Sequence, residues 1–170
     1  MRKNFIWVSL VTILGFFSSF SALSHDGTIR FRGTIDNAGC TISTKNVDVK
    51  FGKLSKNTFG TASNTVGVSK DFSISLTTCP RAETLGISFD GDPDTNNRNV
   101  YNSGVAGVGI QILKANDGTE IKPREHATGL ATVTKGGNAD MQFIAKLIST
   151  NNSVSEGAID KSIGFTIIYP

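Results

Sequence analysis

Two cysteines and two histidines are the side chains of this sequence best suited to bind a metal ion or to form a covalent link. Cys40 and Cys79 could form a disulfide or supply two thiolates to a metal. Neither His25 nor His126 stands at a ligand-like spacing from a cysteine, so a thiolate metal centre would lack its other ligands. The choice between the two depends on the compartment to which the chain is sent.

A run of alternating acidic residues, Asp90, Asp92 and Asp94, has the opening of a calcium-binding loop. Such a loop needs a glycine and, later, a bidentate glutamate, and this chain has Thr95 and Tyr101 at those positions. The run is therefore better interpreted as a turn, and we expect no metal ion there.

No combination of residues predicts catalysis. Serines are plentiful, but none stands in a nucleophile-elbow motif, and His126 follows Glu125 in a polar stretch typical of a surface loop. Gly104, Gly107 and Gly109 have the wrong order for a dinucleotide fingerprint and precede a strand pattern instead of a helix. We expect a protein that is not an enzyme, with no cofactor and no small-molecule substrate.

The beginning of the chain has the pattern of an export signal. Arg2 and Lys3 precede an apolar stretch at 5–17, and Ala22 and Ser24 would occupy the two small positions of a signal-peptidase site. The stretch is too short and too interrupted to span a bilayer. We expect residues 1–24 to be a signal peptide that is removed, with an uncleaved anchor or a buried core segment as the alternatives.

Export limits both the size and the charge of the mature chain. Removal of residues 1–24 from the 170-residue chain leaves 146 residues, which is one domain with a core of its own. The formal charge falls from +3 to +1, because Arg2 and Lys3 leave with the signal. No cluster of lysines and arginines remains that could follow a phosphate backbone, so we expect no nucleic-acid partner.

The same export decides between the two interpretations of the cysteines. In an oxidising compartment, two cysteines predict a single intramolecular disulfide between Cys40 and Cys79. The closed loop of about 40 residues would stabilise the fold by roughly 4 kcal/mol on the chain-entropy model.

After the signal, apolar residues recur at every second position and almost nowhere with a helical period. The alternation occupies the stretches 29–35, 72–76, 110–112 and 163–169. Turn-forming residues lie between them, at 56–57, 90–94, 116–118 and 135–138. Several short strands joined by such turns, with one early disulfide, predict an antiparallel β-sandwich of immunoglobulin type.

The first expected strand is amphipathic. One of its faces would carry Gly27, Ile29, Phe31, Gly33 and Ile35, and the other face would be polar. Taken alone, this pattern predicts an ordinary edge strand that packs on its own domain.

Six motifs in a fixed order carry a resemblance to a known family. They are the amphipathic start at 27–33, Asn-Ala-Gly-Cys-Thr-Ile at 37–42, Leu-Thr-Thr-Cys-Pro at 76–80, Phe-Asp-Gly at 89–91, Gly-Ile-Gln-Ile at 109–112, and the ending at 164–170. Together they resemble the pilins assembled by the chaperone–usher pathway, and in particular the small subunits of type 1 fimbriae. The run 40–44, followed by Asn46 and Val49, is more similar to the minor, tip-adaptor subunits than to the rod subunit.

The C-terminus strengthens the resemblance. Such pilins carry a penultimate tyrosine and a glycine fourteen residues from the end, and this chain has Tyr169 and Gly157 at those positions. Lys161 breaks the apolar alternation between them. The alternating apolar residues are Ile159, Ile163, Phe165 and Ile167.

The resemblance implies an immunoglobulin-like sandwich that lacks its final strand, with residues 25–36 as an N-terminal donor strand and residues 37–170 as the pilin domain. The C-terminal strand at 157–169 would border a groove, which a periplasmic chaperone fills until a neighbouring subunit replaces it at the outer-membrane usher. In that exchange Ile29, Phe31 and Ile35 would enter the neighbour's groove. Gly27 and Gly33 would lie where the groove leaves no room for a side chain.

The function implied is that of a structural subunit of a fimbria, exported through the periplasm to the cell surface, where it supports adhesion. A minor tip subunit is the first interpretation and a major rod pilin the second. From a different class of protein, a self-contained secreted carbohydrate-binding domain would share the signal, the sandwich and the disulfide. Such a domain should complete its own sheet and remain soluble without a chaperone.

Overall fold

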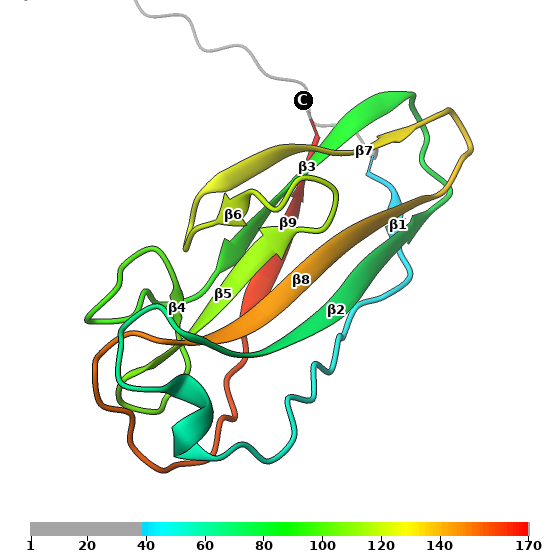
Figure 1. The fold of residues 1–170 in the computed structure, drawn as a ribbon. Helices are drawn as coiled ribbons and strands as arrows, with labels where there is room; N and C mark the ends of the chain where they lie inside the picture. The colour runs from blue at the N-terminus through cyan, green and yellow to red at the C-terminus, as the bar shows by residue number, and fades with distance from the viewer. Residues whose placement is uncertain (1–38, 170) are drawn as a thin grey trace, which may run out of the picture. The chain divides into compact units, whose positions relative to one another are not determined.

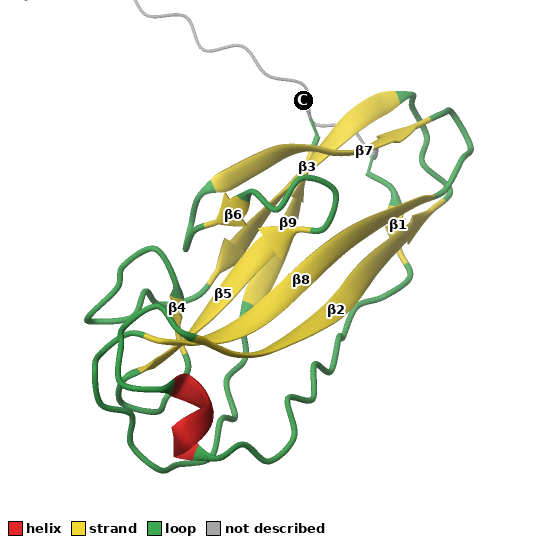
Figure 2. Cartoon of the chain, in the orientation of Figure 1, coloured by secondary structure: helices red, strands yellow, loops and turns green. Residues whose placement is uncertain are grey.

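The structure is a computed structural model that describes residues 39–169. The predicted signal peptide and donor strand, residues 1–36, lie outside this range. Nine strands in two sheets make up the described part, with one short 3-10 helix, η1 (Lys56–Phe59), so the all-β prediction is confirmed (Figures 1 and 2). No helix within residues 39–169 has the length and apolar character needed to cross a membrane.

The larger sheet has the strand order β1-β2-β8-β5-β4, and β6 pairs with β5. All of its pairs are antiparallel. On β2, Ile74 and Leu76 are buried, as the period-two pattern predicts, because alternate side chains of a strand face opposite sides. The strands are β1 (Thr41–Ile42), β2 (Val66–Thr77), β4 (Tyr101–Asn102), β5 (Val108–Lys114), β6 (Glu120–Ile121) and β8 (Ala139–Ser149).

The smaller sheet has the order β7-β3-β9, with β3 at Glu83–Asp90, β7 at His126–Val133 and β9 at Gly164–Ile168. β9 pairs antiparallel with β3, and no other described strand pairs with it, so its second edge is open. His126, expected in a surface loop, is instead the first residue of β7 and is exposed there. The domain is therefore an immunoglobulin-like sandwich that lacks its final strand.

The core between the sheets is rich in aromatic side chains. Phe143 is fully buried and stacks on Phe72 with a centroid separation of 5.1 Å, while Phe89 meets it edge-on at 5.4 Å. Tyr101 is also fully buried, and its hydroxyl donates to the carbonyl of Ile121 at 3.1 Å. Burial raises the pKa of Tyr101, and the nearby carboxylates of two glutamates raise it further.

The predicted disulfide is confirmed. Cys40 and Cys79 are bonded, and both are buried. The bond joins the segment before β1 to the end of β2, beside the turn in which Gly136 donates its backbone N–H to the carbonyl of Cys79 at 2.6 Å. The disulfide thus fastens the beginning of the domain to its core.

We expect Cys40→Ser to reduce the amount of folded protein recovered from the periplasm several-fold. The cross-link contributes roughly 4 kcal/mol by restricting the unfolded chain, and the variant also leaves a buried thiol without its partner. The measurement is the yield of soluble exported protein, with Ser153→Ala as the matched surface control. Equal yields from the variant and the wild type would refute the expectation.

The acidic run forms a turn with internal partners. The carboxylate of Asp94 is buried and accepts the backbone N–H groups of Asn96 and Asn97 at 2.9 and 3.1 Å. Asp90 and Asp92 face Arg124 at 3.7 and 3.2 Å. No cluster of three or more potential metal ligands occurs within the described range. Asp94 thus supports the turn from within, while Asp90 and Asp92 form ion pairs with Arg124 at the surface.

Candidate strand-acceptor groove

A groove of about 1410 Å³ lies between two segments of irregular backbone. The first wall, residues 45–54, leads from β1 to η1, and the second wall, residues 155–165, leads into β9. Figure 1 shows the first wall in cyan along the right-hand edge of the view, and the second in orange to red, rising from the bottom into β9. The floor residues come from β2, β3, β5 and β8: Phe72, Phe89, Val108, Ile110, Ala145 and Leu147.

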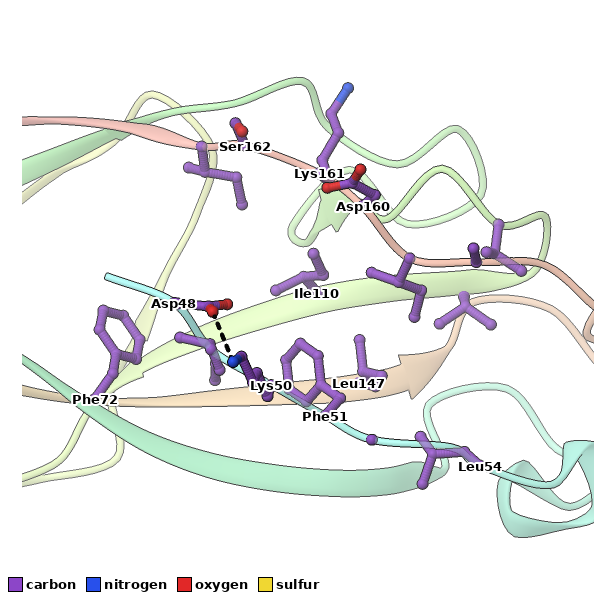
Figure 3. Close-up of a pocket in the computed structure, with 18 of the residues that line it drawn as sticks. Asp48, Lys50, Phe51, Leu54, Phe72, Ile110, Leu147, Asp160, Lys161 and Ser162 are labelled. Atoms are coloured by element: carbon purple, nitrogen blue, oxygen red, sulfur yellow. Dashed lines mark ion pairs between the residues drawn. The ribbon is translucent and has the colours of Figure 1, made fainter. Parts of the chain in front are cut away.

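The floor is continuous with the core of the domain. Ile110 and Leu147 are buried, and both belong to the hydrophobic cluster that also contains Phe143. Figure 3 shows Phe72, Ile110 and Leu147 together with Phe51 of the first wall around the groove. The groove therefore lies directly over the core, with a floor of buried core side chains, and no strand of the described chain lies between its two walls.

The first wall supplies further apolar side chains, and the sequence reasoning missed it. Val47 and Leu54 are 36% and 37% exposed, while Phe51 is half-buried. The missed signal is the alternation of Val47, Val49 and Phe51, which has the same period as the strands that were found. An exposed apolar wall beside an apolar floor favours a site for another polypeptide over a site for a small polar ligand.

The backbone of both walls is unpaired. Within the part of the chain that the structure describes, residues 45–54 and 156–163 make no backbone-to-backbone hydrogen bond. The bonds resume at their ends, where Thr44 donates to Ser75 at 3.4 Å and Ser155 donates to Ala106 at 2.9 Å. Free N–H and C=O groups on both sides of an apolar floor are what an extended strand needs in order to bind.

The second wall carries four of the six C-terminal residues that the sequence placed at the groove. Gly157 lies so close to Val105 that a Cβ there would be 3.0 Å from the valine Cγ2, so the glycine lets the wall approach the core. The residues that line the groove are Gly157, Ile159, Ile163 and Phe165.

The other two residues have different surroundings. Ile167 is buried in the core opposite Ile87 of β3. Tyr169 packs against Gly39, whose added Cβ would lie 3.2 Å from the tyrosine hydroxyl oxygen. Partial burial raises the pKa of Tyr169. The penultimate tyrosine thus fastens the end of the chain beside the disulfide.

One end of the groove is closed. The sequence predicts a simple turn at Lys56-Asn57, but the structure forms the 3-10 helix η1, because the Ser55 hydroxyl accepts the backbone N–H of Asn57 at 3.3 Å and Phe59 is buried. Lys56 of η1 faces Glu156 of the second wall at 3.9 Å, so a charge pair links the two walls there.

The predicted donor residues lie outside the described range, and their role stays a prediction. They are Gly27, Ile29, Phe31, Gly33 and Ile35.

Comparison with known proteins agrees with this geometry. Residues 29–169 match the family model described as fimbrial protein. The chain is 32% identical to long polar fimbria protein A of Salmonella typhimurium (strain LT2), with 99% of this chain and 97% of that protein covered. It is 31% identical to the major fimbrial subunit SMF-1 of Stenotrophomonas maltophilia, with 88% and 95% covered.

The solved structures show the same fold. The crystal structure of the P pilus rod subunit PapA superimposes with a TM-score of 0.63, covering 78% of this chain and all of that one at 22% identity. The family and the fold are those of structural pilus subunits and not of enzymes. With an open groove, a matching family model and full-length relatives, the chain belongs to the fimbrial protein family, as a chaperone–usher pilin exported through the periplasm to a surface fimbria.

Proposed function

We propose that this subunit polymerises by donor-strand exchange. Its groove takes a strand from a periplasmic chaperone, and at the outer-membrane usher the N-terminal segment of the next subunit replaces that strand. The subunit's own residues 25–36 enter a neighbour's groove in the same way. The observation that carries the proposal is the apolar floor between two walls of unpaired backbone.

The free energies expected for strand binding support a fibre that dissociates very slowly. Burying three large apolar side chains of a donor strand contributes roughly 5 to 9 kcal/mol. Each net backbone hydrogen bond to a wall adds about 1 kcal/mol, and both walls offer such bonds. Dissociation of a bound strand is therefore expected to be very slow.

The open groove also bears on the alternative of a self-contained carbohydrate-binding domain. Such a domain should complete its sheets with its own strands, whereas residues 39–169 place no strand between the two walls of this groove. A bare apolar groove beside an open sheet edge is prone to aggregation, and a periplasmic chaperone prevents this.

Within the fibre, we place the subunit among the minor adaptors of the tip. The resemblance at 40–44 supports this position.

A rod subunit is the second candidate. The relative SMF-1 is described as a major fimbrial subunit and matches over nearly its whole length. The amount of the subunit in sheared fibres distinguishes the two positions, because a rod subunit dominates the fibre and an adaptor is present in traces.

The proposed function is tested by purifying the exported chain with and without a candidate chaperone from the same fimbrial gene cluster. We expect a stable one-to-one complex with the chaperone, and aggregation or degradation without it. A peptide with the N-terminal segment of a neighbouring subunit should then displace the chaperone. A stable monomer that binds neither chaperone nor peptide would overturn the proposal.

A further inference from the structure

The second wall of the groove lacks the support that holds ordinary strands in place. Between residue 156 and the start of β9, no backbone hydrogen bond within the described range fixes it. Its position depends on the packing of Ile159 and Ile163 against the core and on charged side chains. One charge pair, Lys56 with Glu156, holds the closed end of the groove.

A second charge pair lies at the other end of the same wall. Lys161 breaks the apolar alternation of the C-terminus, and its Nζ lies 3.8 Å from a carboxylate oxygen of Asp92. The lysine side chain is only 33% exposed, and Figure 3 shows it directed away from the groove. Lys161 stands where the alternation would place another apolar side chain, and it links the second wall to Asp92 instead.

Asp92 has further partners, although its side chain is 68% exposed. Its other carboxylate oxygen accepts a hydrogen bond from Nη2 of Arg124 at 3.2 Å, and Nε of the same arginine lies 3.7 Å from Asp90. Its backbone carbonyl accepts the N–H of Asn102, at the end of β4, at 2.8 Å. The acidic turn is therefore attached to the larger sheet. The carboxylates of Asp90 and Asp92 form a charge network with Arg124 and Lys161.

The turn also packs directly on the wall. A Cβ added to Gly91 would lie 3.3 Å from the side chain of Ile163 and 2.8 Å from the buried ring of Tyr101. Any larger residue at position 91 would push the wall away from the core. The acidic turn therefore contacts the second wall at two points, through Gly91 at Ile163 and through Asp92 at Lys161.

We propose that Lys161, Asp92 and Arg124 form a tether that holds the second wall in place to accept a donor strand, with Lys161 as a positioning residue for strand exchange. The proposal rests on the function proposed above. A wall that is already ordered loses less conformational freedom when a strand binds, so exchange is faster. Networks of charges contribute more than isolated surface pairs, and salt screens them.

The test is the rate at which a peptide displaces the chaperone from the purified chaperone–subunit complex. The probe is a peptide with the N-terminal segment of a neighbouring subunit from the same fimbrial gene cluster, as in the test of the proposed function. We expect Lys161→Gln to slow exchange about three- to tenfold at low salt. Lys161→Arg should restore the wild-type rate, and Lys135→Gln, far from the groove in sequence and exposed, is the matched control.

Two further measurements separate a tether from a general loss of stability. Salt should slow the wild type towards the rate of Lys161→Gln and change that variant little. Asp92→Asn should slow exchange to the same extent, and the double variant should be no slower than either single one. Wild-type rates for Lys161→Gln, or equal salt dependence in both proteins, would overturn the tether while leaving strand exchange intact. No exchange by the wild type would remove the proposed function together with the tether.

Discussion

A subunit that carries Phe31→Arg will be captured by its chaperone but will not be joined to a neighbour through its donor strand. Capture uses the subunit's own groove, which the substitution does not touch. Donation would place a guanidinium over a floor like that of this chain, where Phe72, Ile110 and Leu147 offer no partner for a charge. Burying an unpaired charge costs several kcal/mol, so we expect incorporation to fall by about a hundredfold or more.

The measurement compares two pools of the same variant. Chaperone complexes in the periplasm should be as abundant as in the wild type, and fibres should end at the variant. Thr28→Arg is the matched control, because it adds the same charge to the polar face of the segment and should leave assembly almost unchanged. Fibres of normal length that contain the Phe31→Arg subunit would show that residues 25–36 do not act as the donor strand.

Much of the fold could be predicted because apolar residues recur at every second position in strands with one buried face. Phe72, Ile74 and Leu76 marked β2, and the alternation near the C-terminus marked β9. The disulfide followed from two cysteines and an export signal. The open edge of β9 was implied by the resemblance to the pilin family.

The floor of the groove could not be distinguished from the core by pattern alone. Ile110 and Leu147 are buried apolar strand residues like those of the rest of the core, because the floor of a groove and the interior of a sandwich need the same side chains. What differs is the strand that would lie above them, which no residue of the described range supplies. The sequence of the floor residues therefore does not show that a strand is missing above them.

The first wall shows the converse problem. Val47, Val49 and Phe51 have the period of a strand, but the segment has no strand partner among the described residues and takes irregular backbone. Lys161 appeared only as a break in a pattern, since the sequence does not show that Asp92 lies beside it. Contacts between residues far apart in the chain, made by exposed charges, carry no periodic signal.

Loss of the C-terminal strand should abolish capture by the chaperone altogether. Removal of residues 164–170 deletes β9, which pairs with β3 along its length and ends the second wall of the groove. Because deletion also damages the core through Ile167, a subtler variant is needed, and Phe165→Arg keeps the strand while placing a charge in the groove.

Both changes should leave no subunit bound to a tagged chaperone, whereas removal of Pro170 alone should leave binding as in the wild type. The comparison distinguishes an effect of losing the C-terminal strand from an effect of changing the last residue, because Pro170 lies beyond the apolar alternation that ends at Tyr169. Unchanged co-purification of the Phe165→Arg subunit would mean that the chaperone holds the domain elsewhere. The groove would then need a different occupant, because the exposed apolar side chains of its first wall, Val47 and Leu54, still favour burial.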